Sequence, residues 1–176
     1  MIKKTLLALS ILSLSGVALA EEPAKYYVEA AYGAIRYDEP GAYATPGVGT
    51  LRFGVNFDKN LSAEFMVGTT ITNASGFIGV TPFTIKYDSI YGAYLKAKTE
   101  VAPNFDLYAR LGFVHASISA SVPGATLSAG GSDLSYGIGA QFGFSPTVYG
   151  LVDYMSYYSK DGITAKGPSI GLGLKF

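Results

Sequence analysis

The single histidine of this sequence lies close to a serine, and the two side chains could together do nucleophilic chemistry. His115 and Ser117 are two residues apart, so they share one face if the segment is a β-strand. An imidazole beside a hydroxyl can activate the oxygen as a nucleophile against an acyl ester. The nearest downstream acid that could orient the histidine is Asp133, sixteen residues after Ser117. The sequence is more typical of a histidine that begins a serine-rich loop, and we expect no enzymatic activity.

Metal and cofactor sites are not expected from this composition. One histidine and no cysteine cannot supply the ligands of a typical zinc site. Gly137 and Gly139 lie inside an alternating segment with no helix after it, so they do not form a dinucleotide-binding loop. We therefore expect neither a metal nor a cofactor.

Charged side chains form a second group that could do chemistry, because they alternate with apolar ones. Arg52, for example, lies between Leu51 and Phe53. If these segments are strands, their charges face a common interior, where each charge needs an opposite partner. The candidates for this charge network are Glu29, Arg52, Glu64, Lys96, Asp106, Arg110 and Asp153.

The interior charges balance, and this balance predicts a lumen that is closed by ion pairs. Three further residues bring the set to five basic and five acidic side chains: Lys98, Lys175 and Asp133. A gated ion path through the same residues is the alternative. The distances in sequence from the predicted short turns indicate that Arg52 and Glu64 are cross-strand or diagonal neighbours. The same reasoning predicts that Lys96 and Asp106 are neighbours across the next short turn.

The first twenty residues are typical of a secretory signal peptide. Lys3 and Lys4 precede an apolar run that ends in small residues at Ala20, a run too short and wrongly flanked for a membrane helix. We expect cleavage of residues 1–20 and export of a mature domain over residues 21–176. That domain has two more acidic than basic residues and no basic stripe, so nucleic acid is not an expected partner.

The elements that position these residues are predicted to be strands. The chain has 22 Gly, 14 Tyr and 10 Phe, and 15% of its residues are charged. After the signal peptide no run reaches the roughly 18 apolar residues of a membrane helix, and a closed barrel is the other structure that can cross lipid. Eight segments alternate in polarity, as in such barrels: 25–37, 49–57, 61–71, 86–98, 105–113, 133–144, 148–158 and 168–176.

Alternation within each segment predicts which side chains face outward. In segment 49–57 the outward residues are Leu51, Phe53 and Val55, because successive side chains of a strand point to opposite faces. The same rule places Tyr87 and Tyr158 outside, and Asp88, Tyr94 and Tyr108 inside.

The connections alternate in length, which indicates a barrel with two different ends. Short turns are predicted at 58–60, 103–104 and 145–147, and longer loops at 38–48, 72–83, 117–131 and 159–167. Short periplasmic turns and long external loops are typical of outer-membrane barrels. The predicted fold is all-β, an eight-stranded antiparallel up-and-down transmembrane β-barrel. A soluble, lipocalin-like barrel with its apolar face inward is the alternative, and the glycine-rich opposite face argues against it.

Two sets of outward residues are predicted to have special roles. Aromatic residues beside the short turns are predicted to form a girdle at the lipid interface: Phe57, Phe105, Phe144 and Phe176. The last alternating segment is predicted to be an assembly signal that consists of Ile170, Leu172, Leu174 and Phe176.

The chain resembles the small eight-stranded outer-membrane barrels, namely the OmpA-like transmembrane domain and its OmpX/Ail-type relatives. The matching features are the signal peptide, "LYARLGF" after a short turn, the inward acids and the ending "GLGLKF". The resemblance implies an outer-membrane location, contact with lipid and lipopolysaccharide, and recognition of the last strand by the barrel-assembly machinery. We expect no domain after the barrel, and therefore no peptidoglycan-binding role.

The resemblance implies a structural or surface-interaction role through the external loops, where an external ligand would bind. Two alternatives remain open. One is a small-solute or ion channel. The other is an outer-membrane lipid A deacylase, because the His115-x-Ser117 pair resembles the pair of that family. Here Ile118 stands where that family has asparagine.

Overall fold

The computed structural model describes residues 24–40, 42–78, 81–122 and 124–176. The predicted signal peptide, residues 1–20, lies outside these residues. No helix long and apolar enough to cross a membrane occurs in the described part of the chain. The strands are β1 (Tyr26–Ala34), β2 (Arg36–Glu39), β3 (Ala42–Ala44), β4 (Gly47–Asn56), β5 (Leu61–Thr72), β6 (Ala74–Ile78), β7 (Thr81–Ala102), β8 (Phe105–Val122), β9 (Ala125–Gly143), β10 (Val148–Lys160) and β11 (Ile163–Lys175).

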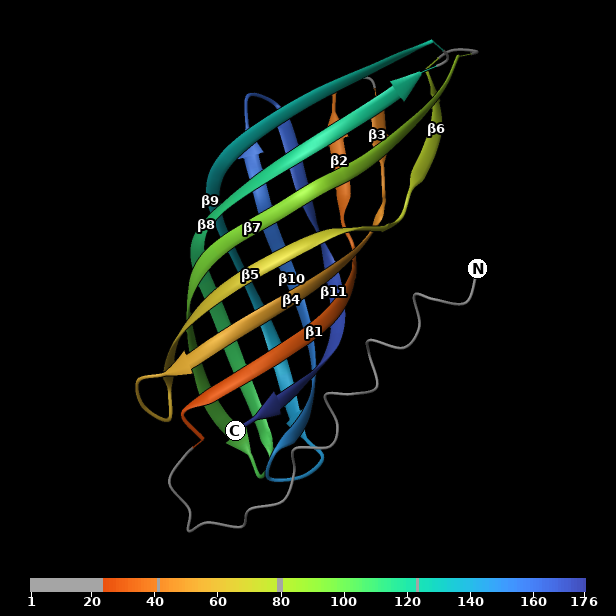
Figure 1. Ribbon diagram of the computed structural model, residues 1–176. Coiled ribbons are helices and arrows are strands. Elements are labelled where there is room, and N and C mark those ends of the chain that lie inside the picture. The colour runs from red at the N-terminus through yellow and green to blue at the C-terminus, as the bar shows by residue number, and fades with distance from the viewer. Residues whose placement is uncertain (1–23, 41, 79–80, 123) are drawn as a thin grey trace.

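Eight of these strands close into one antiparallel barrel (Figure 1). Each barrel strand pairs with the next one along the chain, in the order β1, β4, β5, β7, β8, β9, β10 and β11. The barrel closes where β1 pairs with β11, with Tyr27 opposite Lys175 and Gly33 opposite Ser169. The predicted eight-stranded up-and-down barrel is confirmed.

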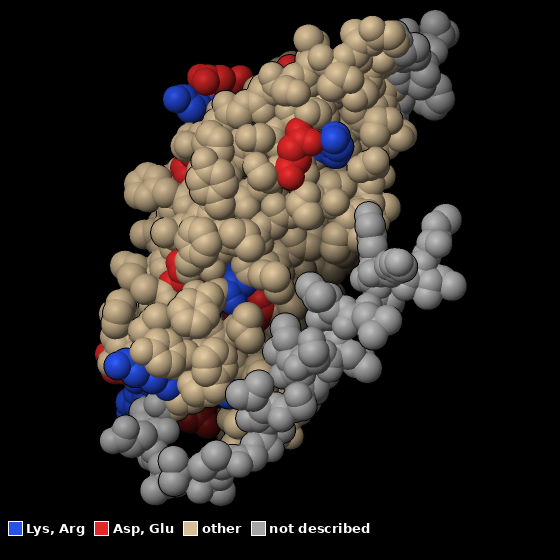
Figure 2. Space-filling model, viewed as in Figure 1, with Lys and Arg blue, Asp and Glu red and all other residues tan. Residues whose placement is uncertain are grey.

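The barrel is apolar outside and polar inside. On β4, Leu51 and Phe53 are 54% and 45% exposed, whereas Arg52 between them is 1% exposed. Large apolar side chains cover the outer wall on every barrel strand, and Figure 2 shows this face largely free of charge. A soluble barrel would bury its apolar face, so the lipocalin-like alternative is wrong.

The predicted long loops are largely β-structure, which corrects the expectation of irregular loops. Strands β8 and β9 continue as one hairpin to Val122 and Ala125, and with β7 they extend furthest toward the upper right of Figure 1. Hydroxyl groups pair across this hairpin, with 2.9 Å between Ser119 Oγ and Ser128 Oγ. Residues 117–131 were predicted to be a loop, but their small polar side chains allow β8 and β9 to stay paired beyond the apolar band, the part of the outer wall that carries the large apolar side chains. Two shorter additions extend the same end: β2 and β3, which pair with each other beside β11, and β6, which pairs with β7.

Two β-bulges reverse the predicted facing of several residues. The register shifts between Tyr87 and Ser89 on β7, so Tyr87 is buried inside and Asp88 is outside. A second shift between Ser156 and Tyr158 on β10 turns Tyr158 toward the buried interior cluster. The extra residue of a bulge breaks strict alternation, so the outward predictions for Tyr87 and Tyr158 and the inward one for Asp88 are wrong.

Glycines let neighbouring strands and inward side chains approach one another, and one of them offers a direct test. A methyl group at Gly112 would collide with the backbone oxygen of Ala93 and the backbone of Tyr94. We expect Gly112→Ala to lower the free energy of unfolding by about 1–3 kcal/mol, as measured by denaturant titration in micelles. The matched control is Gly130→Ala, whose methyl group would meet atoms no nearer than 3.5 Å. Equal stability of the two variants would contradict the close packing at Gly112.

Candidate functional site: a charge cluster across the lumen

A guanidinium group from β8 lies at the centre of the lumen. Arg110 Nη2 is 2.5 Å from Glu29 Oε2 on β1, and Nε is 2.6 Å from Glu64 Oε2 on β5. Its third nitrogen, Nη1, is 2.6 Å from Asp153 Oδ2 on β10. All four side chains are fully shielded from solvent. One arginine therefore joins three strands that lie around the barrel wall.

Two further cations complete the cluster. Lys96 Nζ on β7 is 2.7 Å from Glu29 Oε1 and 3.6 Å from Glu64 Oε1. Arg52 on β4 is more loosely held, at 4.0 Å from Glu29 and 3.9 Å from Asp153. Three cations thus face three carboxylates, which is the condition under which buried charges are tolerated.

Hydroxyl groups add hydrogen bonds to all three carboxylates. Tyr149 donates to Glu29 Oε1 at 2.8 Å, and Tyr27 donates to Glu64 Oε1 at 2.7 Å. Ser169 donates to Asp153. Buried charges are stabilised when such hydrogen bonds accompany the ion pair. The cluster is therefore a connected network.

Apolar and aromatic layers lie on both sides of the cluster. Tyr27, Tyr149 and Leu151 pack together on the short-turn side. On the other side lies a larger cluster that includes Met66 and Met155, both with no exposed surface. The layers and the charges together fill the middle of the barrel, as expected for an interior that eight strands leave just wide enough for side chains.

Asp106 lies apart from this cluster, toward the short turns. Its carboxylate is 3.6 Å from Lys98 Nζ and accepts a hydrogen bond from Gln141 at 2.8 Å. Both side chains of the Lys98–Asp106 pair are about one-fifth exposed. They line a polar cavity of about 890 Å³ that also contains Lys175 and Tyr149. This cavity is the vestibule at the short-turn end.

The two pairs predicted from the turns have different outcomes. On β4 and β5, Arg52 lies opposite Met66 and Gly54 opposite Glu64, so Arg52 and Glu64 are diagonal neighbours as predicted. Lys96 instead lies opposite Arg110, because β7 continues to Ala102 before its turn. The predicted pairing of Lys96 with Asp106 is therefore wrong.

His115 and Ser117, the pair on which the deacylase alternative rests, lie on the outer wall at the long-hairpin end. A methyl group at Gly130 would lie 3.5 Å from Ser117 Oγ and 3.6 Å from His115 Nε2, so both side chains border one patch of surface. His115 Nδ1 is 2.9 Å from Ser132 Oγ, and the imidazole stacks on Tyr91. The carboxylate of Asp133 accepts hydrogen bonds from the backbone N–H groups of residues 134 and 159.

A charged pair on the outer wall marks the end of the apolar band. Lys86 Nζ is 2.9 Å from Asp88 Oδ1, and both side chains are well exposed. Charges on the lipid face of a barrel are destabilising, so this pair belongs outside the membrane-spanning part. The hydroxyl of Ser119 donates to Asp88, and this hydrogen bond and the Lys86 ammonium lower the pKa of the Asp88 carboxyl.

The predicted girdle and assembly residues face outward, and the four girdle residues lie near the short-turn end. Phe57, Phe144 and Phe176 are 59–63% exposed, and Phe105 is half-buried. Of the last segment, Ile170 and Leu172 are exposed and Leu174 is half-buried. The backbone of Phe176 exchanges two hydrogen bonds with Tyr26, so this residue lies at the seam that closes the barrel.

Sequence reasoning missed the side chains that complete the lumen. The phenols of Tyr27 and Tyr149 and the hydroxyl of Ser169 were not assigned to the charge network, although alternation places all three inward. Met66 and Met155 were missed for the same reason: apolar residues at inward positions have no chemical pattern that distinguishes them. The signal that could have found these residues is their position within the strand. Met66, for example, lies between Phe65 and Val67, which both face outward.

Comparison with known proteins agrees with this architecture. The family model described as "Outer membrane protein beta-barrel domain" matches residues 5–176. A search among curated proteins finds no match.

Several solved structures have a similar fold. The attachment invasion locus protein Ail of Yersinia pestis is 19% identical, with a TM-score of 0.66 over 88% of this chain and 100% of Ail. The structure of Ail in complex with the heparin analogue sucrose octasulfate is 21% identical, with a TM-score of 0.65 over 88% of this chain and 100% of Ail. Neisserial surface protein A is 15% identical, with a TM-score of 0.69 over 89% of this chain and 100% of that protein. At these identities the likeness shows the fold alone.

The family model spans nearly the whole chain, and the eight-stranded barrel carries its apolar side chains outward. The family implies an outer-membrane location. This protein therefore belongs to the outer membrane β-barrel family.

Proposed function

We propose that this protein is a non-enzymatic outer-membrane barrel with a closed lumen, whose long-hairpin end makes contacts at the cell surface. The observation that carries the proposal is the position of Arg110. Its guanidinium pairs with carboxylates from β1, β5 and β10, so opening a path requires several buried ion pairs to break together. Breaking a buried pair is strongly unfavourable, which supports a plug over a steady channel.

The long-hairpin end supplies the surface for contacts, since it extends beyond the apolar band. Two ion pairs lie there, Arg36 with Asp38 at 2.6 Å and Lys86 with Asp88 at 2.9 Å. Lys160, Asp161 and Lys166 at the same end are exposed. Ail, a structural neighbour, has been solved with a heparin analogue, and this supports a search for an external ligand here. Basic and acidic residues are mixed at this end and form no basic patch, which favours an uncharged partner surface over a polyanion.

We also propose that the outer wall contacts two further kinds of partner, the lipids of the outer membrane and the barrel-assembly machinery. The apolar band contacts lipid and lipopolysaccharide, with Phe57, Phe105, Phe144 and Phe176 at the interface. The last segment, Ile170 to Phe176, is the part that the barrel-assembly machinery recognises.

The surroundings of His115 support a non-enzymatic role. A base that activates a serine is normally oriented by a third group, often a carboxylate. Here Ser132 contacts the imidazole Nδ1, and both oxygens of the Asp133 carboxylate are hydrogen-bonded to backbone groups.

The closed lumen predicts that purified protein in planar bilayers gives no large, steady conductance. Brief, small events are expected from rearrangement of loosely held Arg52, which lies 3.9–4.0 Å from its carboxylate partners. A stable porin-like current in the wild-type protein would overturn the plug and favour the channel.

A variant with an opened plug is the control that shows the protein has inserted. Replacing Glu64 and Arg110 together with alanine removes one anion and one cation, so the net charge of the lumen is unchanged. This double variant is expected to conduct more than the wild type. Heat-modifiable migration on a gel checks that both proteins are folded before the bilayer measurement.

A further inference from the structure

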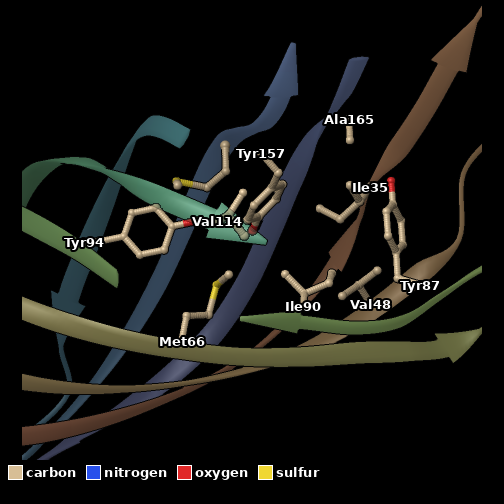
Figure 3. Close-up of a cluster of buried hydrophobic side chains, with 10 residues drawn as sticks. Ile35, Val48, Met66, Tyr87, Ile90, Tyr94, Val114, Tyr157 and Ala165 are labelled. Atoms are coloured by element: carbon tan, nitrogen blue, oxygen red, sulfur yellow. The ribbon is translucent and has the colours of Figure 1, made fainter. Parts of the chain in front are cut away.

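The long-hairpin end of the lumen contains an apolar cavity that the charge cluster does not use. Its volume is about 110 Å³, and its wall includes Ile35, Tyr87, Ile90, Val114, Ile118 and Ala165. Figure 3 shows several of these side chains converging from different strands. Met66 and Met155 belong to the same buried cluster, and Tyr157 of the cavity wall contacts Arg52 of the charge cluster.

One polar group of the cavity wall has no partner in the described part of the chain. Tyr87 is 2% exposed, and its hydroxyl forms no hydrogen bond with any described residue. Of the three other tyrosines of the wall, Tyr37 donates to Glu39, Tyr157 accepts from Arg52, and Tyr158 is partly exposed. Figure 3 shows the ring of Tyr87 beside Ile35, with the hydroxyl at its far end.

A buried hydroxyl without a partner is costly, and it limits what can occupy the cavity. Water needs two to four polar partners to be held in such a site, whereas this wall is mostly apolar. A molecule with an apolar body and one oxygen would bury its body and satisfy the hydroxyl, which can both donate and accept. An engineered apolar cavity of about 150 Å³ binds benzene, and this cavity is smaller, at about 110 Å³, so its ligand can be no larger than one six-membered ring with its oxygen.

We propose that this cavity binds a small, uncharged, mainly apolar molecule with one hydrogen-bonding oxygen, of about the size of phenol. The ligand enters from the long-hairpin end and stops above the methionines. The hydroxyl of Tyr87 selects the oxygenated molecule over the plain hydrocarbon. This site goes beyond the surface role proposed above, and it does not depend on whether the lumen conducts.

Phenol and benzene are suitable probes, because they differ by one hydroxyl group. Isoleucine methyl groups labelled for NMR report the site: Ile35 and Ile90 are buried at the cavity, while Ile138 and Ile170 are 70% and 64% exposed on the outer wall. Phenol is expected to shift the cavity methyl signals saturably. If the methyl signals of the outer wall shifted as much as those of the cavity, and neither saturated, phenol would only be partitioning into the detergent, and the proposed site would be overturned.

Removing the hydroxyl tests the role of Tyr87. The ratio of phenol affinity to benzene affinity is expected to fall about fivefold in Tyr87→Phe, the value of one hydrogen bond. The matched control Tyr136→Phe makes the same change on the outer wall, where Tyr136 is 53% exposed, and should leave the ratio unchanged. An unchanged ratio in Tyr87→Phe would overturn the proposed selectivity.

A second variant fills the cavity. Ala116 is part of its wall, and Ala116→Leu is expected to abolish the saturable shifts of both probes while the protein keeps its heat-modifiable migration. Retained binding in this folded variant would place the probes elsewhere and contradict the proposal.

Discussion

Replacing Arg110 with methionine is expected to lower the free energy of unfolding of the barrel by about 3–5 kcal/mol, the range for breaking a buried ion pair. Methionine keeps much of the side-chain length but removes the three contacts of 2.5–2.6 Å to Glu29, Glu64 and Asp153. Three buried carboxylates would then share two cations, Lys96 and the loosely held Arg52. Denaturant titration in micelles measures the loss.

The matched control is the same substitution at an exposed ion pair. Arg36 is 2.6 Å from Asp38, and their side chains are 50% and 45% exposed. Such pairs contribute about 0–1 kcal/mol, so Arg36→Met should change stability by no more than that. If Arg110→Met cost as little as Arg36→Met, the lumen carboxylates would have to be solvated, and the closed plug would be refuted.

Much of the fold was predictable because lipid imposes strict rules on a chain that crosses it. Every backbone group must pair, so the strands close into a barrel, and the outward residues must be apolar. The alternation of Leu51, Arg52 and Phe53 therefore predicted both the strand and its facing. The bulges at Asp88 and Tyr157 were not predictable in this way. A bulge adds one residue without a distinct composition, and beyond the apolar band lipid no longer constrains which face is polar.

The members of the charge cluster were easier to predict than its contacts. Facing follows from alternation along one strand, whereas partners depend on how eight strands are staggered around the barrel. Arg110 contacts residues 81 and 46 positions away in the sequence, and no local pattern records such separations. The apolar cavity was missed entirely, because it arises from Tyr87 turning inward at a bulge.

Replacing Phe176 with aspartate is expected to reduce the folded barrel in the outer membrane severalfold while the precursor is still processed. The backbone of Phe176 closes the seam by exchanging hydrogen bonds of 2.9 and 3.0 Å with Tyr26, and its ring lies 6.2 Å from that of Tyr26. Aspartate keeps the backbone bonds, so the variant isolates the side chain. Deleting Phe176 removes both and should be worse. Heat-modifiable migration of the membrane fraction measures the folded amount.

The same substitution at Phe144, a second aromatic residue beside a short turn, distinguishes recognition of the last segment during assembly from packing of its side chain in the folded barrel. Phe144 is 63% exposed and Phe176 is 59% exposed, and an acidic side chain near the lipid interface costs only about 0–1 kcal/mol at either position. If the last segment is read during assembly, Phe176→Asp should lower the folded amount in cells far more than Phe144→Asp, while both variants fold equally well when refolded into micelles. Equal loss in cells would reduce Phe176 to one member of the aromatic girdle, and poor refolding of Phe176→Asp alone would assign its role to closure of the seam.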